Sequence, residues 1–347
     1  MKVSIIGGGG LVGSSAAYAL QISGKVSEIC LIDANLESAQ GHACELLNAS
    51  ALTSDVRVFA GSMADISNTD IVVITAGLRR KPDESRLDLI HRNVDLFLSI
   101  LSEVTKAGLK KSAYLIIVSN PVDVLTYLAV QRSGLPWQRV LGLGTQLDSA
   151  RFRGNLGQAL NVPPSQIHAL ILGEHGDSMV PIWSSASING LPLAQWPSYT
   201  PALGAKAFED TKTAGATLIK LKGGSSMAVG HSIREVVESI ADDSRRILPV
   251  STLQLGLYGL RDVCLSVPSI VGCGGCRQQI QLNLLPKEHQ GLQQSARVLR
   301  EMIDQVESRI GRVRAEASLV SEGNSGPRGN AVPHSVHRSI PRSAWGK

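Results

Sequence analysis

The fold is decided by the stretch Val3-Ser4-Ile5-Ile6-Gly7-Gly8-Gly9-Gly10-Leu11-Val12-Gly13 near the start of the chain. A short apolar run there, typical of a buried strand, meets four glycines, and a helical pattern of apolar residues follows. The pattern G-x-G-x-x-G, anchored on its last glycine, is meaningful in this strand-to-helix context, because backbone amides at a helix N-terminus can bind a dinucleotide pyrophosphate. The predicted cofactor-binding residues of this motif are Gly8, Gly10, Leu11, Val12 and Gly13.

A carboxylate stands where such a site needs one. Asp33 ends the second predicted strand, twenty residues after Gly13. At that distance its carboxylate can accept hydrogen bonds from both ribose hydroxyls, and it would repel a 2′-phosphate. The sequence therefore predicts NAD as the cofactor, in preference to NADP.

Strand and helix patterns alternate through the first part of the chain, which predicts an α/β fold with a Rossmann doubly wound parallel sheet. We expect strands at residues 3–7, 28–33, 56–59, 70–75 and 113–119, and helices at 12–23, 36–51 and 87–107. A mixed α/β substrate domain follows, with helices at 146–160, 204–221, 226–241 and 288–310 and strands at 167–172, 247–255, 263–271 and 280–284. The predicted domains are 1–143, which binds NAD, and 144–314, which is catalytic, followed by a disordered basic tail at 315–347.

Composition excludes several classes of function. Of the 347 residues, 43% are hydrophobic and 18% are charged, which is ordinary for a soluble enzyme. No apolar run is long enough to span a membrane, and no secretory signal pattern is present, so we expect a cytoplasmic protein. The formal net charge is +5. Residues 318–347 carry four basic residues and one acidic residue, so the rest of the chain is nearly neutral and predicts no nucleic-acid partner.

Two further segments suggest acid–base chemistry on a carboxylic acid. Leu172-Gly173-Glu174-His175-Gly176-Asp177-Ser178 places a histidine in a turn after an apolar strand, and Asp148-Ser149-Ala150-Arg151 begins a helical pattern. A histidine that exchanges a proton near neutral pH needs a carboxylate to hold its tautomer and to stabilise its cation. An arginine fork can bind the carboxylate of an α-keto acid.

These segments resemble the GEHGD and LD-x-x-R motifs of the lactate/malate dehydrogenase family, and the resemblance extends from Lys2 to about Arg312. It implies that His175 and Asp148 form the acid–base pair, and that Arg86 polarises the substrate carbonyl. It also implies that Arg151 grips the substrate carboxylate, and that the protein is a homodimer or homotetramer. No second Cys/His pair stands near Cys273 and Cys276 to complete a zinc site, so we expect no metal.

The resemblance implies further site residues. Thr75-Ala76-Gly77 follows the fourth predicted strand, at the carboxyl edge of the sheet where ligands bind in open α/β folds. Asn93, Val118 and Asn120 match positions that line the nicotinamide side, and Asn120 also reaches the substrate. Ser225 occupies a position of the substrate pocket.

The choice of acid depends on Arg80, in the loop Leu78-Arg79-Arg80-Lys81-Pro82. By resemblance this loop is a lid over the substrate, and malate enzymes carry an arginine at this position. Under a closed lid an arginine would pair with the second carboxylate of oxaloacetate, whereas pyruvate would leave it desolvated and unpaired. We therefore predict a malate dehydrogenase of the tricarboxylic acid cycle, which acts on a dicarboxylate.

Other interpretations stay open. Residues 84–89 and 256–259 are more like the lactate branch, and a shift of the lid by one residue would turn Arg79 inward instead of Arg80. L-lactate dehydrogenase, or a dehydrogenase of another 2-hydroxy acid, is therefore the alternative. A catalytically silent NAD-binding redox sensor would use Cys273 and Cys276, whose spacing otherwise fits a turn between strands.

Overall fold

The structure is a computed structural model that describes residues 1–79 and 83–311. The side chain of Arg86 is outside the described part, as are Arg80 and the predicted tail at 315–347. Residues 1–314 belong to one compact unit.

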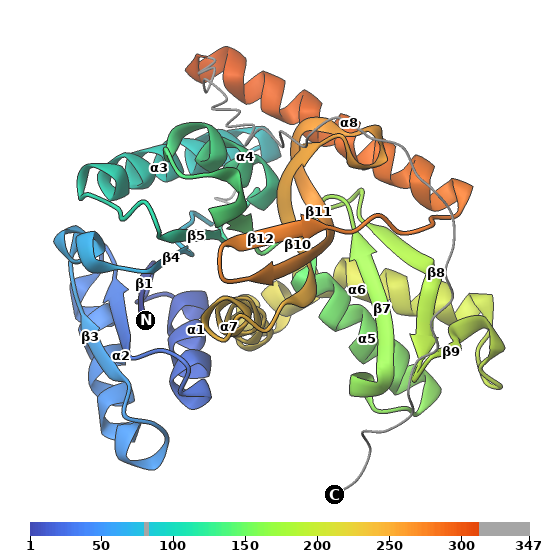
Figure 1. Cartoon of the computed structure of the whole chain (residues 1–347), viewed down its shortest axis with the longest axis horizontal. Coiled ribbons are helices and arrows are strands. Elements are labelled where there is room, and N and C mark those ends of the chain that lie inside the picture. Colours follow the sequence, from blue (N-terminus) through green and yellow to red (C-terminus); the bar gives the residue numbers. More distant parts are fainter. Residues whose placement is uncertain (80–82, 312–347) are drawn as a thin grey trace, which may run out of the picture. The chain divides into compact units, whose positions relative to one another are not determined.

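A nine-stranded sheet in the order β12-β11-β10-β6-β5-β4-β1-β2-β3 runs through the described part (Figure 1). Strands β1 to β6 pair in parallel, and β10 to β12 extend the sheet antiparallel beyond β6. The sheet thus continues past residue 142, and the predicted domain boundary at 143 stays a prediction. The strands are β1 (Lys2–Ile6), β2 (Glu28–Ile32), β3 (Arg57–Ala60), β4 (Ile71–Ile74), β5 (Tyr114–Ile117), β6 (Val140–Gly142), β10 (Arg246–Leu255), β11 (Arg261–Gly272) and β12 (Gly275–Gln279).

A smaller antiparallel sheet joins β7 (Ile167–Leu172), β8 (Val180–Ile188) and β9 (Leu191–Pro192). The helices are α1 (Leu11–Ser23), α2 (Leu36–Ala49), α3 (Arg86–Lys106), α4 (Val122–Arg132), α5 (Gln146–Leu160), α6 (Pro201–Lys222), α7 (Met227–Ala241) and α8 (Pro286–Ile310). Short 3-10 helices are η1 (Ser50–Leu52), η2 (Met63–Asn68), η3 (Trp137–Arg139), η4 (Pro164–Gln166), η5 (Leu193–Gln195) and η6 (Leu257–Gly259).

The parallel strands are apolar on both faces because each face is covered by helices. In β4, Val72 and Ile74 belong to a core with α3, α4 and α8, whereas Ile71 and Val73 belong to a core with α1, α2 and α7. A third core lies between the small sheet and helices α5 and α6. The predicted fold, a Rossmann sheet followed by a mixed α/β part, is confirmed.

The strand predicted at residues 280–284 is wrong. That segment is irregular, and the last strand of the sheet is β12, just before it. Leu282 and Leu284 pack against the core, which explains their strand-like alternation with polar neighbours. The backbone amide of Leu282, however, donates to the hydroxyl of Tyr258, 2.7 Å away, instead of a neighbouring strand. Alternating burial therefore occurs here without a β-ladder.

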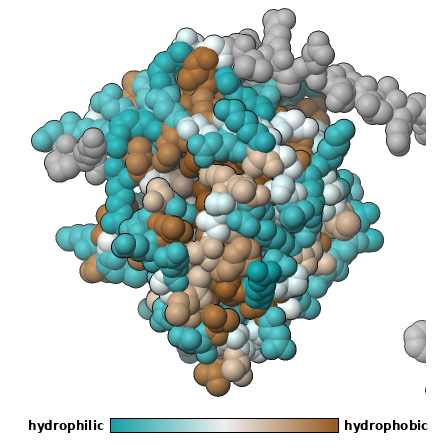
Figure 2. All heavy atoms as spheres, turned by 90° about the vertical axis from the view of Figure 1, so that its left-hand side faces the viewer, coloured by the Kyte–Doolittle hydropathy of each residue, from teal (hydrophilic) through white to brown (hydrophobic). Residues whose placement is uncertain are grey.

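The side of the molecule that carries α1 and α2 exposes apolar side chains. Leu36, Leu47 and Leu52 are each at least half exposed on α2 and η1, and Figure 2 shows apolar side chains gathered among hydrophilic ones on this side. Grouped apolar side chains of this kind are typical of a surface that binds another protein. The homodimer or homotetramer stays a prediction. Among the described helices, none combines the length and the apolar character that crossing a bilayer requires.

Candidate active site

His175 and Asp148 meet at the carboxyl end of β7, as the two motifs predict. His175 follows β7 in the turn, and Asp148 lies in the first turn of α5. Nδ1 of His175 is 2.5 Å from Oδ2 of Asp148, whose side chain is 1% exposed. This contact fixes the orientation of the ring and leaves Nε2 available to a ligand.

The charge of Asp148 favours the protonated imidazole. Burial by itself would lower the pKa of His175, but the negative charge and the hydrogen bond of Asp148 outweigh it, and the pKa is raised above its usual value. Because the pKa is raised, the imidazolium persists to a higher pH than in a free histidine. The residue can therefore act as a proton donor near neutral pH.

Arg151 joins the same cluster, one turn along α5. Its Nη1 is 3.3 Å from Oδ1 of Asp148, and its Nη2 donates to Oγ of Ser225 at 3.3 Å. Both contacts are long for charge-assisted hydrogen bonds. The guanidinium is therefore held in position beside His175, and its fork can exchange these partners for a bound carboxylate.

Ser225 lies in the loop between α6 and α7, and α7 packs very closely against α1. A Cβ at Gly230 of α7 would lie 2.6 Å from the carbonyl oxygen of Ser15 in α1, so only glycine fits there. Helices α1 and α7 consequently lie side by side (Figure 1). The loop between α6 and α7 passes near the start of α1, since a Cβ at Gly224 would lie 3.9 Å from Cδ1 of Leu11.

The glycine motif forms a tight turn between β1 and α1. A Cβ at Gly13 would lie 2.2 Å from the carbonyl oxygen of Gly7, which itself has a φ of +90°. Helix α1 begins after Gly10, and among the described residues no side chain caps it and no acidic residue occupies its first turn. A diphosphate fits a helix N-terminus with these properties.

Asp33 lies beside this turn, just after β2. Its Oδ2 accepts from the backbone amide of Gly9 at 2.9 Å, and its Oδ1 accepts from the amide of Asn35 at 2.9 Å. These bonds hold the carboxylate at the carboxyl edge of the sheet. A ribose bound next to the diphosphate would meet it there.

The remaining predicted cofactor residues lie at the same edge. Asn93, which is 6% exposed, accepts from the backbone amide of Leu78 at 2.7 Å and so ties the segment after β4 to α3. Oγ1 of Thr75 donates to the carbonyl oxygen of Ile6 at 3.0 Å. Asn120 is exposed just after β5. The others at this edge are Ala76, Gly77 and Val118.

Two predicted substrate residues are not placed by the structure. Arg80 lies outside the described residues, and only the backbone of Arg86 is described, as the first residue of α3 after the N-cap Ser85.

A second buried acid near His175 was not predicted from the sequence. Asp123 lies in the first turn of α4, and its Oδ2 accepts from the backbone amide of His175 at 2.8 Å. A carboxylate in the first turn of a helix is common because it interacts favourably with the helix dipole, so nothing in the sequence indicated this long-range contact.

The two cysteines proposed for redox sensing lie at a hairpin between β11 and β12. Cys273 is exposed in the turn, and Cys276 is buried in β12. Burial raises the pKa of Cys276 to about 11, so its reactive thiolate form is disfavoured. This environment is typical of a structural thiol. Within the described part of the chain, no three metal-ligating side chains gather.

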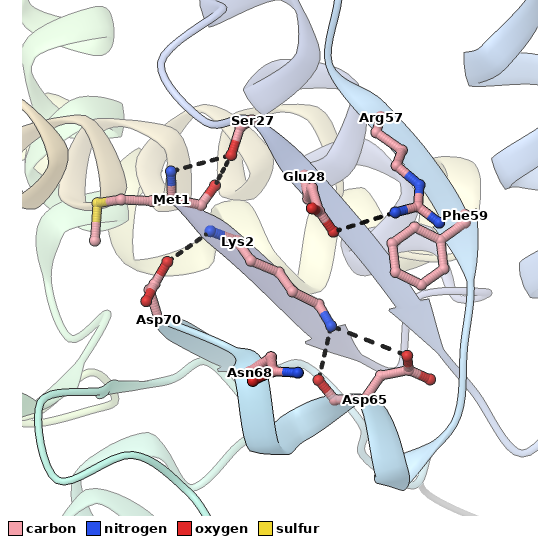
Figure 3. Close-up of a pocket in the computed structure, with 9 residues that line it drawn as sticks. All are labelled: Met1, Lys2, Ser27, Glu28, Arg57, Phe59, Asp65, Asn68 and Asp70. Atoms are coloured by element: carbon pink, nitrogen blue, oxygen red, sulfur yellow. Dashed lines mark hydrogen bonds and ion pairs between the residues drawn. The ribbon is translucent and has the colours of Figure 1, made fainter.

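A surface pocket of about 470 Å³ lies at the opposite, amino edge of the sheet (Figure 3). Lys2, Arg57, Glu28 and Asp65 line it, and these charges largely pair with one another. None of the predicted site residues contributes to this pocket.

Known proteins match nearly all of the described chain. The family model for the lactate/malate dehydrogenase NAD binding domain matches residues 1–142, and the model for the alpha/beta C-terminal domain matches residues 145–310. The chain is 41% identical to an L-lactate dehydrogenase of Synechococcus sp. (strain JA-3-3Ab), over 88% of this chain and 99% of the relative. It is 39% identical to that of Gloeobacter violaceus, over 88% and 94%.

A solved structure is similar as well. The crystal structure of the minor L-lactate dehydrogenase from Enterococcus mundtii, in its ligands-bound form, superposes with a TM-score of 0.84 at 37% identity. The match covers 88% of this chain and 98% of that one.

Proposed function

Since the chain belongs to the lactate/malate dehydrogenase family and is an NAD-dependent 2-hydroxy-acid dehydrogenase, we propose that it is an L-lactate dehydrogenase. It would interconvert L-lactate and pyruvate. One observation carries this proposal: relatives that share 39–41% of its residues over 88% of the chain bear the name L-lactate dehydrogenase.

The same finding overturns the prediction of malate as substrate. The predicted dicarboxylate substrate and the predicted place in the tricarboxylic acid cycle are therefore wrong as well. That prediction depended on Arg80 alone. An arginine excludes pyruvate only where its guanidinium is desolvated in the site without a counter-charge; where it keeps contact with solvent, it carries no such penalty.

The cluster around Asp148 suits reduction of a keto acid. When bound, NADH supplies a hydride for the carbonyl carbon of pyruvate. His175 then gives its proton from Nε2 to the carbonyl oxygen, while Asp148 stabilises the imidazolium through Nδ1. Arg151 binds the carboxylate of pyruvate with its guanidinium fork and so orients the carbonyl toward His175.

The other site residues take supporting roles in this proposal. Asp33 binds the adenosine ribose and selects against NADP, and the turn up to Gly13 holds the diphosphate. Asn93 and Asn120, together with the segment after β4, line the nicotinamide side, and Ser225 borders the substrate. Arg86 polarises the carbonyl by family resemblance.

Steady-state oxidation of NADH with pyruvate and with oxaloacetate tests the proposal. We expect kcat/KM for pyruvate to exceed that for oxaloacetate by at least about tenfold, a difference of about 1.4 kcal/mol between the two transition states. A preference for oxaloacetate would refute the assignment of the acid, and turnover of neither acid with NADH would refute the function. The variant His175→Gln is the control for background oxidation.

A further inference from the structure

Asp123 places a second buried carboxylate against His175, from a different helix than Asp148. Its side chain is 2% exposed, and Oδ2 accepts from the backbone amide of His175 at 2.8 Å. The two carboxylates therefore hold the same residue at two points, Asp148 at the ring and Asp123 at the main chain. Neither contact duplicates the other.

Few other groups around Asp123 offset the cost of burying its carboxylate. Its Oδ1 forms no hydrogen bond with any described residue that meets the usual geometry, and the buried hydroxyl of Ser251 beside it is likewise without a regular partner. Arg151, the cation of the cluster, is instead hydrogen-bonded to Asp148 and Ser225. Among the described residues, the positive charge that acts on Asp123 is thus the imidazolium of His175.

We infer that Asp123 is a positioning residue for the proton donor: it anchors the main chain of His175 and supplies a second buried negative charge that favours the imidazolium. This inference rests on the proposed role of His175 as the proton donor to pyruvate.

The charged groups around the pair support this direction. Asp148 and Asp123 both raise the pKa of His175, whereas Arg151 lowers it. Burial raises the pKa of Asp123 to about 7, the hydroxyl of Ser251 and the charge of His175 act against that rise, and the charge of Glu174 adds to it. The thiol of Cys264 on β11 is neutral, because burial holds its pKa well above the usual value. Protonation of His175 and ionisation of Asp123 therefore favour each other.

The variant Asp123→Asn separates the two roles, because an amide oxygen can still accept from the His175 amide while the charge is lost. The first readout is the pKa of His175, measured by NMR titration of its ring in the full-length protein, with His175→Gln to assign the signal. We expect the pKa to fall by about half a unit to one unit in Asp123→Asn. The second readout is the pH profile of KM for pyruvate.

The profile distinguishes charge from structure. Below the pKa of His175 in both proteins, Asp123→Asn should match the wild type; above it, KM for pyruvate should rise about three- to tenfold, the factor that such a pKa shift implies. Asp123→Ala, which loses the anchor as well, should also lower kcat at every pH. Glu288→Gln is the matched control, since Glu288 is 4% exposed and accepts from three backbone amides; it should leave both readouts unchanged.

Three results would overturn the inference. An unshifted His175 pKa in Asp123→Asn excludes the electrostatic role, and an equal loss of activity at all pH values reduces Asp123 to a structural residue. If neither variant folds, the titration in Asp148→Asn decides, because Asp123 is then the remaining carboxylate hydrogen-bonded to His175. An imidazole pKa at or below the ordinary 6.5 in that variant rejects the inference, and a pKa that stays above 6.5 supports it. Because NMR does not need turnover, it also separates this inference from the proposed function, which fails if pyruvate is not reduced.

Discussion

Replacing Asp148 by Asn should move the pH dependence of pyruvate reduction. The carboxylate is 1% exposed and lies 2.5 Å from Nδ1 of His175, so the change removes a charge-assisted hydrogen bond from a buried imidazolium. Hydrogen bonds to charged groups contribute about 1.5–3 kcal/mol. That free energy corresponds to a fall of about one to two units in the pKa of His175.

The raised pKa of His175 sets the direction of the pH effect. His175 has a raised pKa in the wild type, so the proton that it donates stays bound to a higher pH than on a free histidine. In Asp148→Asn the proton is lost at a lower pH. Above that point kcat/KM for pyruvate should be about 10- to 100-fold below the wild type, while the two proteins converge at low pH.

The assay is steady-state oxidation of NADH from pH 5 to pH 9, with the Kd for NADH measured by fluorescence as a check on the cofactor site. Asp65→Asn is a suitable control, because Asp65 is a partly exposed carboxylate at the amino edge of the sheet (Figure 3). An unchanged midpoint of the pH profile in Asp148→Asn would refute the reasoning. A uniform loss at all pH values would mean that Asp148 acts on the geometry of the site alone.

Other substitutions test the rest of the site. Asp33→Ser should lower the ratio of kcat/KM for NAD to kcat/KM for NADP, because the repulsion of the 2′-phosphate is removed. An unchanged ratio would contradict the role of Asp33 in selecting NAD. Gly13→Ala should abolish NADH binding and lower Tm, since its Cβ would lie 2.2 Å from the Gly7 carbonyl oxygen; normal binding by titration would exclude the tight turn. Arg151→Lys should raise KM for pyruvate by about tenfold or more, because the ammonium group cannot form the two parallel hydrogen bonds of a guanidinium. A KM equal to that of the wild type would argue against a contact between Arg151 and the carboxylate of pyruvate. Asp123 has its pKa raised to about 7, so the stability that its protonated form contributes is present below about pH 4 and is lost as the pH rises to about 7; denaturant titrations should therefore show wild type losing stability relative to Asp123→Asn over that window.

The local signals in the sequence were sufficient for the fold and for the cofactor. Glycines between a strand and a helix, followed by Asp33 at the end of the next strand, predicted the dinucleotide turn, because its geometry depends on residues close together in the chain. The α5 and β7 boundaries also agree with the predicted ranges. Their patterns are long and regular, and local propensity and packing favour the same structure there.

Where a side chain's role depends on a distant partner, the sequence determined less. It supplied His175, Asp148 and Arg151 as residue types, and the resemblance paired them, but the 2.5 Å contact exists only because α5 and the end of β7 pack together. Asp123 was missed for the same reason, since 52 residues separate it from His175. The strand predicted at 280–284 failed because burial alternates there without a β-ladder. Hydrophobic periodicity depends on residues that are neighbours in the chain, so it can be recognised in the sequence. The hydrogen-bond partners of a buried group, and the charges that it faces, come from segments that meet only when the chain has folded.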